Sequence, residues 1–311
     1  ALGRVDRGLG RPVPARRLGL PVGEPGLRLG AAEQALDARR VGGGLEEDHV
    51  GVGADASDPT VRERLEAAGK LFRIPRAGGG TISVLGPIPM PLHIGGERID
   101  LQWYATVRNT ELTRLEDLAA DLRAKHGERS FAELASSMAV NSVLVIGDRE
   151  SWANPLVRVH SSCLTGDVFG SERCECGPQL HSAIELINAD EEGGLLIYMA
   201  GHEGRGIGLW AKAATYLLQD SGEDTYQANR SLGLPDDSRD FSDAASLLKY
   251  FVAGKPFRLL TNNPKKVVAI GGHGLVVADR VPIEVTPNAA NARYLRTKRE
   301  TAFPAGSRYR Y

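Results

Sequence analysis

The sequence predicts an α/β fold: a layered domain with a mixed or parallel sheet and flanking helices, preceded by a poorly structured N-terminal extension. After residue 140, short apolar runs typical of strands alternate with segments whose apolar residues recur at helical spacing. The composition, with 42% hydrophobic and 25% charged residues, is that of an ordinary globular protein. The first 60 residues contain no Phe, Trp, Tyr, Lys or Met, so they can bury little apolar surface.

Two strands and a helix are expected at the start of the folded part. The apolar segments 81–85 and 99–107 are separated by a proline cluster, which indicates two antiparallel strands around a turn. Residues 111–125 carry leucines at helical spacing with charges on the other face. This pattern predicts an amphipathic helix.

The alternating part of the chain supplies the remaining elements. Apolar runs predict strands at 142–146, 156–160, 195–199, 257–261 and 275–278. Helical spacing predicts helices that contain 180–187, follow Gly208 and contain 241–248. The resulting organisation is a low-complexity extension (1–80), N-terminal strands with a helical insertion (81–139), the main α/β domain (140–303) and a C-terminal tail (304–311).

Charge and hydropathy disfavour two classes of partner. The net charge of -1 lacks the basic excess expected of a nucleic-acid-binding protein. No apolar run approaches the roughly 18 residues needed to span a bilayer, and nothing near Ala1 resembles a signal peptide. We therefore expect a cytoplasmic protein that binds neither nucleic acid nor membrane.

All three cysteines lie in one short window, which favours a metal site over a disulfide framework. Cys163, Cys174 and Cys176 offer three thiolates on loops, and catalytic zinc commonly keeps three protein ligands and one water. Such a water is acidified by the metal, which suggests hydrolysis or deamination. Two alternatives stay open: a closed structural site completed by His160 or His181, and a set of inert buried cysteines.

Two further loops have the chemistry of phosphate-binding segments. Residues 203–208 are glycine-rich between a predicted strand and a predicted helix, and residues 261–266 offer a hydroxyl, two amides and two ammonium groups. Together with a zinc site, they imply a nucleotide. The charged run 236–240 reads on spacing alone as a solvated helix cap.

Four ordered motifs resemble one enzyme family. They are VRVHSSCLTGDVFGSERCECGPQL (157–180), EGRGIGL (203–209), LLTNNPKK (259–266) and YLRTK (294–298). This set, with its CX10CXC spacing, is similar to GTP cyclohydrolase II. The resemblance implies a homodimeric enzyme of riboflavin biosynthesis that opens the imidazole ring of GTP at C8. The expected products are formate, pyrophosphate and 2,5-diamino-6-ribosylamino-pyrimidinone 5′-phosphate.

The resemblance also implies residue roles. Cys163, Cys174 and Cys176 correspond to the zinc ligands, and Mg²⁺ would accompany the triphosphate. Asp237 falls on the proton acceptor, Arg239 on the arginine that acts at the α-phosphate, and Tyr216 on an active-site tyrosine. The expected GTP contacts are Arg158, Val159, His160, Ser161, Ser162, Gln179, Glu203, Gly204, Arg205, Thr225, Thr261 and Lys266.

Two departures from the family pattern leave alternatives open. Ser162 stands where the family usually has a glutamate before the first zinc ligand, and His202 arrives where an arginine–glutamine pair is usual. These changes are compatible with a specialised paralogue that makes a related, still formylated pyrimidine nucleotide. A third class is a non-catalytic binding or scaffold protein stabilised by zinc.

Overall fold

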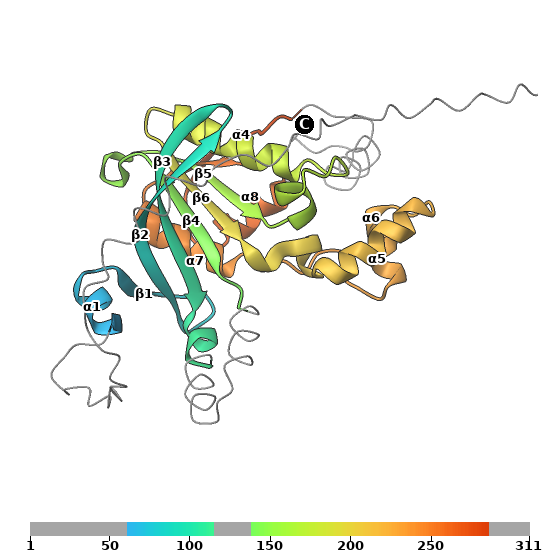
Figure 1. The fold of residues 1–311 in the computed structure, drawn as a ribbon, viewed down its shortest axis with the longest axis horizontal. Helices are drawn as coiled ribbons and strands as arrows, with labels where there is room; N and C mark the ends of the chain where they lie inside the picture. The colour runs from blue at the N-terminus through green and yellow to red at the C-terminus, as the bar shows by residue number, and fades with distance from the viewer. Residues whose placement is uncertain (1–60, 115–137, 286–311) are drawn as a thin grey trace, which may run out of the picture. The chain divides into compact units, whose positions relative to one another are not determined.

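The computed structural model describes residues 61–114 and 138–285. The strands in these ranges are β1 (Leu71–Pro75), β2 (Thr81–Ile94), β3 (Glu97–Arg108), β4 (Asn141–Ile146), β5 (Leu156–Ser161), β6 (Gly194–Met199), β7 (Phe257–Leu260) and β8 (Val277–Val281). They form one sheet in the order β1-β2-β3-β4-β6-β5-β7-β8 (Figure 1). Strands β1, β2, β3, β4 and β6 pair antiparallel in that order, and β6, β5, β7 and β8 pair parallel. The fold is α/β with a mixed sheet, as the sequence predicts.

Helices cover both faces of this sheet. The α-helices that lie wholly within the described ranges are α1 (Val61–Ala67), α4 (Cys176–Ala189), α5 (Leu209–Asp220), α6 (Thr225–Ser231), α7 (Ser242–Val252) and α8 (Pro264–Gly271). One apolar core joins β-strand residues to α7 and α8, and a second joins the opposite face to α4. No helix among the described residues is long and apolar enough to cross a membrane.

Strand β5 shows how the sequence divides its side chains between these two cores. Val157 and Val159 belong to the core that contains α7, whereas Leu156 belongs to the core that contains α4. Side chains alternate along a strand, so Arg158 lies on the α4 side and Ser161 on the α7 side. The two faces of β5 therefore deliver different functional groups to the site described below.

Strand β2 runs through the proline cluster in which we expected a turn. The reversal comes later, at Gly95 and Gly96, which both adopt positive φ. Beyond Leu85, β2 pairs with β3 but no longer with β1. Pro87 lies in the register irregularity between Leu85 and Ile88, and Pro89 and Pro91 place their missing N–H groups on one edge, because alternate residues of a strand point the same way.

Other differences concern where elements begin. Helix α1 and strand β1 lie within residues 61–80, so the sheet starts earlier than composition predicts. Strand β8 begins at Val277 rather than at residue 275, and α6 and α8 were not predicted. Residues 109–114 are helical. The rest of the helix predicted at 111–125, the first 60 residues, the YLRTK motif and the 304–311 tail lie outside the described residues.

Ion pairs join the N-terminal strands to α7. Asp243, in the first turn of α7, is 5% exposed and accepts hydrogen bonds from Nε of Arg76 and from Nε of Arg108 at 2.8 Å. Arg76 follows β1 and Arg108 ends β3. The buried carboxylate of Asp243 thus links the ends of β1 and β3 to the first turn of α7.

Replacing Asp243 with alanine is expected to destabilise the protein by about 2–3 kcal/mol. The change leaves two guanidinium groups without their buried partner, and the partial exposure of Arg108 keeps the cost below that of a fully buried pair. Urea unfolding measures the loss. Asp100→Ala, which breaks the exposed Arg98–Asp100 pair, is the control and should leave the midpoint unchanged. Equal midpoints for the two variants would show that the Asp243 pairs contribute no stability.

Candidate active site

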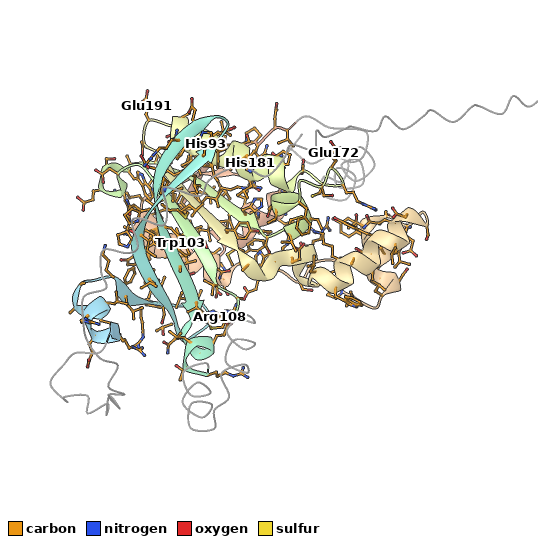
Figure 2. The ribbon with its side chains drawn as sticks, viewed as in Figure 1. His93, Trp103, Arg108, Glu172, His181 and Glu191 are labelled. Atoms are coloured by element: carbon orange, nitrogen blue, oxygen red, sulfur yellow. The ribbon has the colours of Figure 1, made fainter. Side chains whose placement is uncertain are left out.

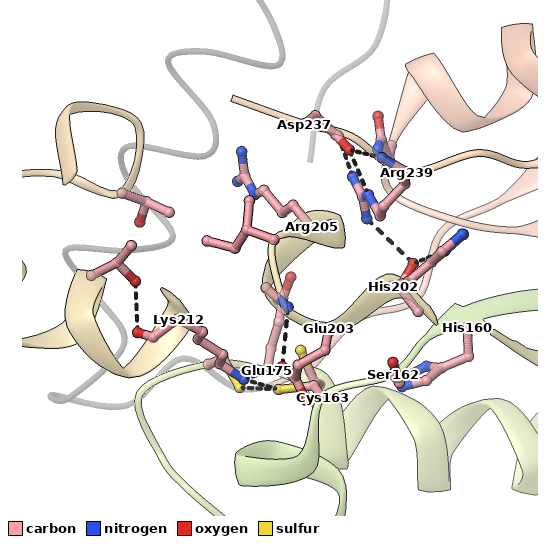
Figure 3. A pocket seen from close by; sticks show the side chains of 18 of the residues that line it. His160, Ser162, Cys163, Glu175, His202, Glu203, Arg205, Lys212, Asp237 and Arg239 are labelled. Atoms are coloured by element: carbon pink, nitrogen blue, oxygen red, sulfur yellow. Dashed lines mark hydrogen bonds and ion pairs between the residues drawn. The ribbon is translucent and has the colours of Figure 1, made fainter. Parts of the chain in front are cut away.

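The carboxyl ends of β5, β6 and β7 open into one pocket of about 270 Å³. Ligand sites in α/β proteins commonly lie at this edge of the sheet. The segments that follow the three strands line the pocket, together with α5, α6 and the 236–240 loop (Figure 3). Both phosphate-friendly loops and the cysteine window are therefore brought together, although they lie far apart in the sequence.

The three cysteines form a compact cluster in this pocket. Their sulfur atoms all lie within 4.8 Å of one another, and Sγ of Cys163 is 3.7 Å from Sγ of Cys174. Two of the cysteines are buried. A tetrahedral zinc site with Zn–S bonds of about 2.3 Å has sulfur atoms about 3.8 Å apart. The cluster thus fits a zinc ion by both donor chemistry and spacing.

Neither histidine considered as a fourth ligand joins the cluster. Nε2 of His160 lies 3.2 Å from both carboxylate oxygens of Asp167, and His181 is exposed on α4. Within the described residues, the metal-ligating group consists of the three cysteines alone. This arrangement favours a site with a position open to water or substrate over a closed structural site.

Gly166 makes room for the cluster. A Cβ atom on this residue would lie 2.8 Å from Sγ of Cys174 and 3.2 Å from Sγ of Cys163. Real Cβ atoms almost never approach other atoms as closely as the first of these distances. A side chain at position 166 would therefore push the sulfur atoms apart.

We expect Gly166→Ala to lower the zinc content of the purified protein to well below one ion per chain. The added methyl group displaces the sulfur atoms from the spacing that zinc requires. Elemental analysis after dialysis measures the ratio. Gly271→Ala is the control, because a Cβ at position 271, the last residue of α8, meets nothing within 4 Å and the backbone there does not have a positive φ. Full zinc content in Gly166→Ala would contradict this account of the cluster.

Lys212 is a buried cation beside the sulfur atoms that the sequence analysis missed. Its Nζ donates to Oε1 of Glu203 at 2.7 Å, to Oγ1 of Thr165 at 2.9 Å and to Sγ of Cys163 at 3.1 Å. Burial alone would lower the pKa of Lys212, but hydrogen bonds to Glu203 and Cys163 outweigh it and raise the pKa. The ammonium group therefore stays charged and offsets the negative charge of the cluster.

The thiols of the cluster differ in pKa, so they do not carry negative charge equally. Hydrogen bonds from Cys174 and Cys176, and then from Lys212, lower the pKa of Cys163. The hydrogen bond with Cys163 raises the pKa of Cys174 to about 11. Without a metal, one thiolate is thus favoured, whereas a divalent cation would stabilise all three.

Asp167 is a second residue that the sequence analysis missed. Its Oδ2 accepts hydrogen bonds from the backbone N–H of Cys163 and from Oη of Tyr198, both at 2.9 Å. The same carboxylate faces Nε2 of His160, whose ring stacks on Tyr198. Burial lowers the pKa of His160. Asp167 therefore fixes both the first cysteine and the ring of His160.

The 203–208 loop has the backbone of a tight, strained turn. Gly204 and Arg205 both adopt left-handed conformations, with φ of 59° and 65°. For arginine this region is uncommon and points to a local constraint. The guanidinium of Arg205 lies over the ring of Tyr226 at 4.4 Å, and its carbonyl accepts from the backbone N–H of Ser238. Oε2 of Glu203 accepts from the backbone N–H of Leu164 at 2.6 Å.

The 261–266 segment is the start of a helix rather than a free loop. Asn263 caps α8 through Lys265 N–H, and Pro264 occupies the first turn. Lys266 is 5% exposed, and its Nζ donates to the carbonyl of Val159 at 2.7 Å. The side chain of Val159 itself packs in the core. Val159 therefore does not present its side chain to the pocket, so the expected substrate contact would have to come from its backbone.

Asp237 and Arg239 face each other across a bidentate ion pair. Nε of Arg239 donates to Oδ1 of Asp237 at 2.9 Å, and an Nη2 hydrogen bond to Oδ2 measures 2.6 Å. Burial alone would raise the pKa of Asp237, but the bonds and charge of Arg239 hold it below its ordinary value. The 236–240 run is therefore part of the pocket and not merely a solvated cap.

The remaining predicted residues also reach the pocket. Tyr216 places its hydroxyl 3.3 Å from Oγ1 of Thr165, and Oε1 of Gln179 accepts from Arg158 at 2.8 Å. Oγ of Ser162 donates to the carbonyl of Ala200 at 2.8 Å. Of the residues predicted from the sequence, those lining the pocket are Arg158, His160, Ser161, Ser162, Cys163, Cys174, Cys176, Gln179, Glu203, Gly204, Arg205, Tyr216, Thr225, Asp237, Arg239, Thr261 and Lys266.

Comparison with protein families finds one match. Residues 118–282, which make up more than half of the chain, match the family model described as GTP cyclohydrolase II. This range contains the cysteine cluster, both loops and the Asp237–Arg239 pair.

Curated proteins similar to the chain include three that carry the same name. Riboflavin biosynthesis protein RibBA of Nocardia farcinica (strain IFM 10152) is 56% identical over 158 residues, or 50% of this chain and 37% of that protein. RibBA of Mycobacteroides abscessus is 58% identical over 145 residues, covering 47% and 34%. RibBA of Salinispora arenicola (strain CNS-205) is 49% identical over 188 residues, covering 59% and 44%. The chain spans less than half the length of these relatives.

Proposed function

The chain belongs to the GTP cyclohydrolase II family, and we propose that it opens the imidazole ring of GTP by hydrolysis at C8. The proposed products are formate, pyrophosphate and 2,5-diamino-6-ribosylamino-pyrimidinone 5′-phosphate. The main support is one pocket that combines three clustered thiols with the cationic side chains of Arg205, Arg239 and Lys266. We further propose a role in riboflavin biosynthesis, from the names of the relatives, and a homodimer, from the family resemblance.

We assign Cys163, Cys174 and Cys176 as ligands of one zinc ion. When bound, zinc would supply a Lewis acid and a water of lowered pKa, the nucleophile that ring opening and deformylation require. Lys212 supports this role because its ammonium group donates to Sγ of Cys163 and partly offsets the charge of three thiolates. Tyr216, linked to Lys212 through Oγ1 of Thr165, is our candidate for orienting the guanine base of GTP.

The cationic part of the pocket is suited to a triphosphate. Arg205, Arg239 and Lys266 reach it from three different segments, and each guanidinium can donate two parallel hydrogen bonds to a phosphate. Mg²⁺ bound to the triphosphate would neutralise charge as pyrophosphate leaves. We assign Arg158, Gln179, Thr225 and Thr261 as additional substrate contacts, since all four line the same pocket.

We propose that Arg239 and Asp237 act together at the α-phosphate. Asp237 holds the guanidinium plane through two hydrogen bonds, so a positive charge stands preorganised where negative charge develops. The guanidinium remains protonated at ordinary pH, which makes electrostatic stabilisation its main contribution. Asp237, ionised in this pair, is available to accept a proton as the phosphate bond breaks.

One observation supports a second candidate function. Residue 162 is a serine, so it offers no carboxylate beside Cys163. Its Oγ donates a hydrogen bond to the carbonyl of Ala200. Because a carboxylate there could assist proton transfers at the reacting carbon, its loss favours an enzyme that stops earlier. The alternative is therefore a paralogue that releases a ring-opened nucleotide with its formyl group retained.

Product identification distinguishes the two functions. Purified protein is incubated with GTP, zinc and magnesium, and formate, pyrophosphate and the nucleotide product are quantified by enzymatic assay and mass spectrometry. The proposed function gives one formate and one pyrophosphate for each GTP consumed. A formylated pyrimidine product would establish the paralogue, and no consumption of GTP would refute both.

A further inference from the structure

His202 lines the pocket, and both of its ring nitrogens make hydrogen bonds. It is 5% exposed and belongs to the turn that follows β6. Its Nδ1 lies 3.2 Å from Oγ of Ser161, at the end of β5, and its Nε2 lies 2.9 Å from the carbonyl oxygen of Asp240. The side chain thus bridges a strand of the sheet and the loop that carries Asp237 and Arg239.

Hydrogen-bond accounting fixes the direction of each contact. A carbonyl oxygen can only accept, so Nε2 of His202 carries the hydrogen that Asp240 receives. In a neutral ring Nδ1 is then an acceptor, and Ser161 donates its hydroxyl hydrogen to it. Oγ of Ser161 in turn accepts from Nη1 of Arg239 at 3.3 Å. One tautomer therefore satisfies a continuous chain of hydrogen bonds from Arg239 through Ser161 and His202 to the carbonyl of Asp240.

The surroundings of His202 preserve this tautomer. Burial, together with the charges of Arg239 and Lys266, lowers the pKa of the ring to about 4, against the opposing effects of the Asp240 carbonyl and of Asp237. Phe241 packs edge-on against the ring with centroids 5.0 Å apart. The imidazole therefore stays neutral at neutral pH, and Nδ1 remains free to accept from Ser161.

We propose that His202 is a positioning residue that holds the 236–240 loop against the end of β5 and aims the guanidinium of Arg239. The ion pair between Asp237 and Arg239 lies within this loop and would move with it. The contacts through Ser161 and His202 instead anchor the loop to β5 and to the segment after β6. His202, which stands where the family usually has an arginine–glutamine pair, thus provides a structural link to Arg239. The kinetic consequences rest on the proposed function.

Kinetics of His202 variants test this role. His202→Ala is expected to lower kcat for pyrophosphate release by about 10- to 100-fold, with little change in KM or zinc content. His202→Gln keeps an N–H donor for the Asp240 carbonyl and should recover part of kcat. His181→Ala, which removes an exposed histidine on α4, is the control and should match the parent (Figure 2). A His202→Ala enzyme with the parental kcat would overturn the proposal.

A double variant separates positioning from general damage. If His202 acts through Arg239, adding His202→Ala to Arg239→Ala should slow the enzyme by no more than about twofold. A full second loss would show that His202 acts independently and would overturn the proposal.

A spectroscopic readout does not depend on GTP turnover. In ¹⁵N NMR spectra at neutral pH, His202 should be protonated on Nε2, and the Nε–Hε resonance of Arg239 should shift in His202→Ala. An unchanged Arg239 resonance would overturn the positioning role even in a protein that consumes GTP. A parent that shows both signals but leaves GTP intact would refute the proposed function while supporting this inference.

Discussion

Replacing Cys174 with serine is expected to remove zinc from the protein and to reduce GTP turnover below detection. The thiolate is the proposed metal ligand, and a serine hydroxyl remains protonated at neutral pH and binds zinc poorly. The fold should survive, because the apolar cores on both sides of the sheet extend far beyond the cluster. Elemental analysis, circular dichroism and the formate assay measure the three properties on one preparation.

The control for this variant is Thr215→Ser. Thr215 is a buried residue of α5 that lines the same pocket, and its hydroxyl donates to the carbonyl of Lys212. The substitution keeps that hydroxyl and should keep both zinc and activity. A folded, zinc-free Cys174→Ser protein with parental turnover would exclude a catalytic role for the metal.

Arg239→Ala and Asp237→Ala should each reduce turnover by about 100- to 1000-fold and leave the zinc content unchanged. In the proposed function Arg239 supplies a preorganised positive charge for the α-phosphate, and Asp237 holds its guanidinium through two hydrogen bonds. Neither residue belongs to the cysteine cluster. Pyrophosphate release measured alongside bound zinc separates this loss from loss of the metal.

Arg230→Ala is the matched control for these two variants. Arg230 makes a similar two-bond pair with Asp236, but it is exposed and does not line the pocket. Its removal should leave turnover unchanged. Parental pyrophosphate release by either Arg239→Ala or Asp237→Ala would contradict the assigned roles.

The fold was most predictable where a strand is buried on both faces. Strands β4 and β6 are short and largely apolar, and the structure places them at the centre of the sheet. Strand β2 was harder, because its prolines signal a turn in isolation. They are tolerated here because that part of β2 lacks β1 as a partner, which depends on sheet order and not on local sequence.

The candidate site was predictable where chemistry is concentrated locally. Three cysteines in one window indicate a metal site, and the structure clusters their sulfur atoms. Lys212 and Asp167 were missed because their partners come from distant segments. The sequence did hold one signal for Lys212. This lysine precedes Tyr216 by four residues in a helix rich in alanine and leucine, and residues at that spacing lie on the same face of a helix. Asp167, four residues after Cys163, lies in the quoted motif without any sign of its partner Tyr198.

The proposed function requires that the C8 atom of GTP become the carbon of formate at the cysteine cluster. It is tested most directly with GTP carrying ¹³C at C8, incubated with the parent protein and with Cys174→Ser while ¹³C NMR follows the label. We predict that the parent converts the labelled carbon to free formate in step with pyrophosphate release, and that Cys174→Ser leaves it in the purine ring. Labelled carbon that stays in the ring with the zinc-loaded parent, or formate released equally by both proteins, would contradict the account.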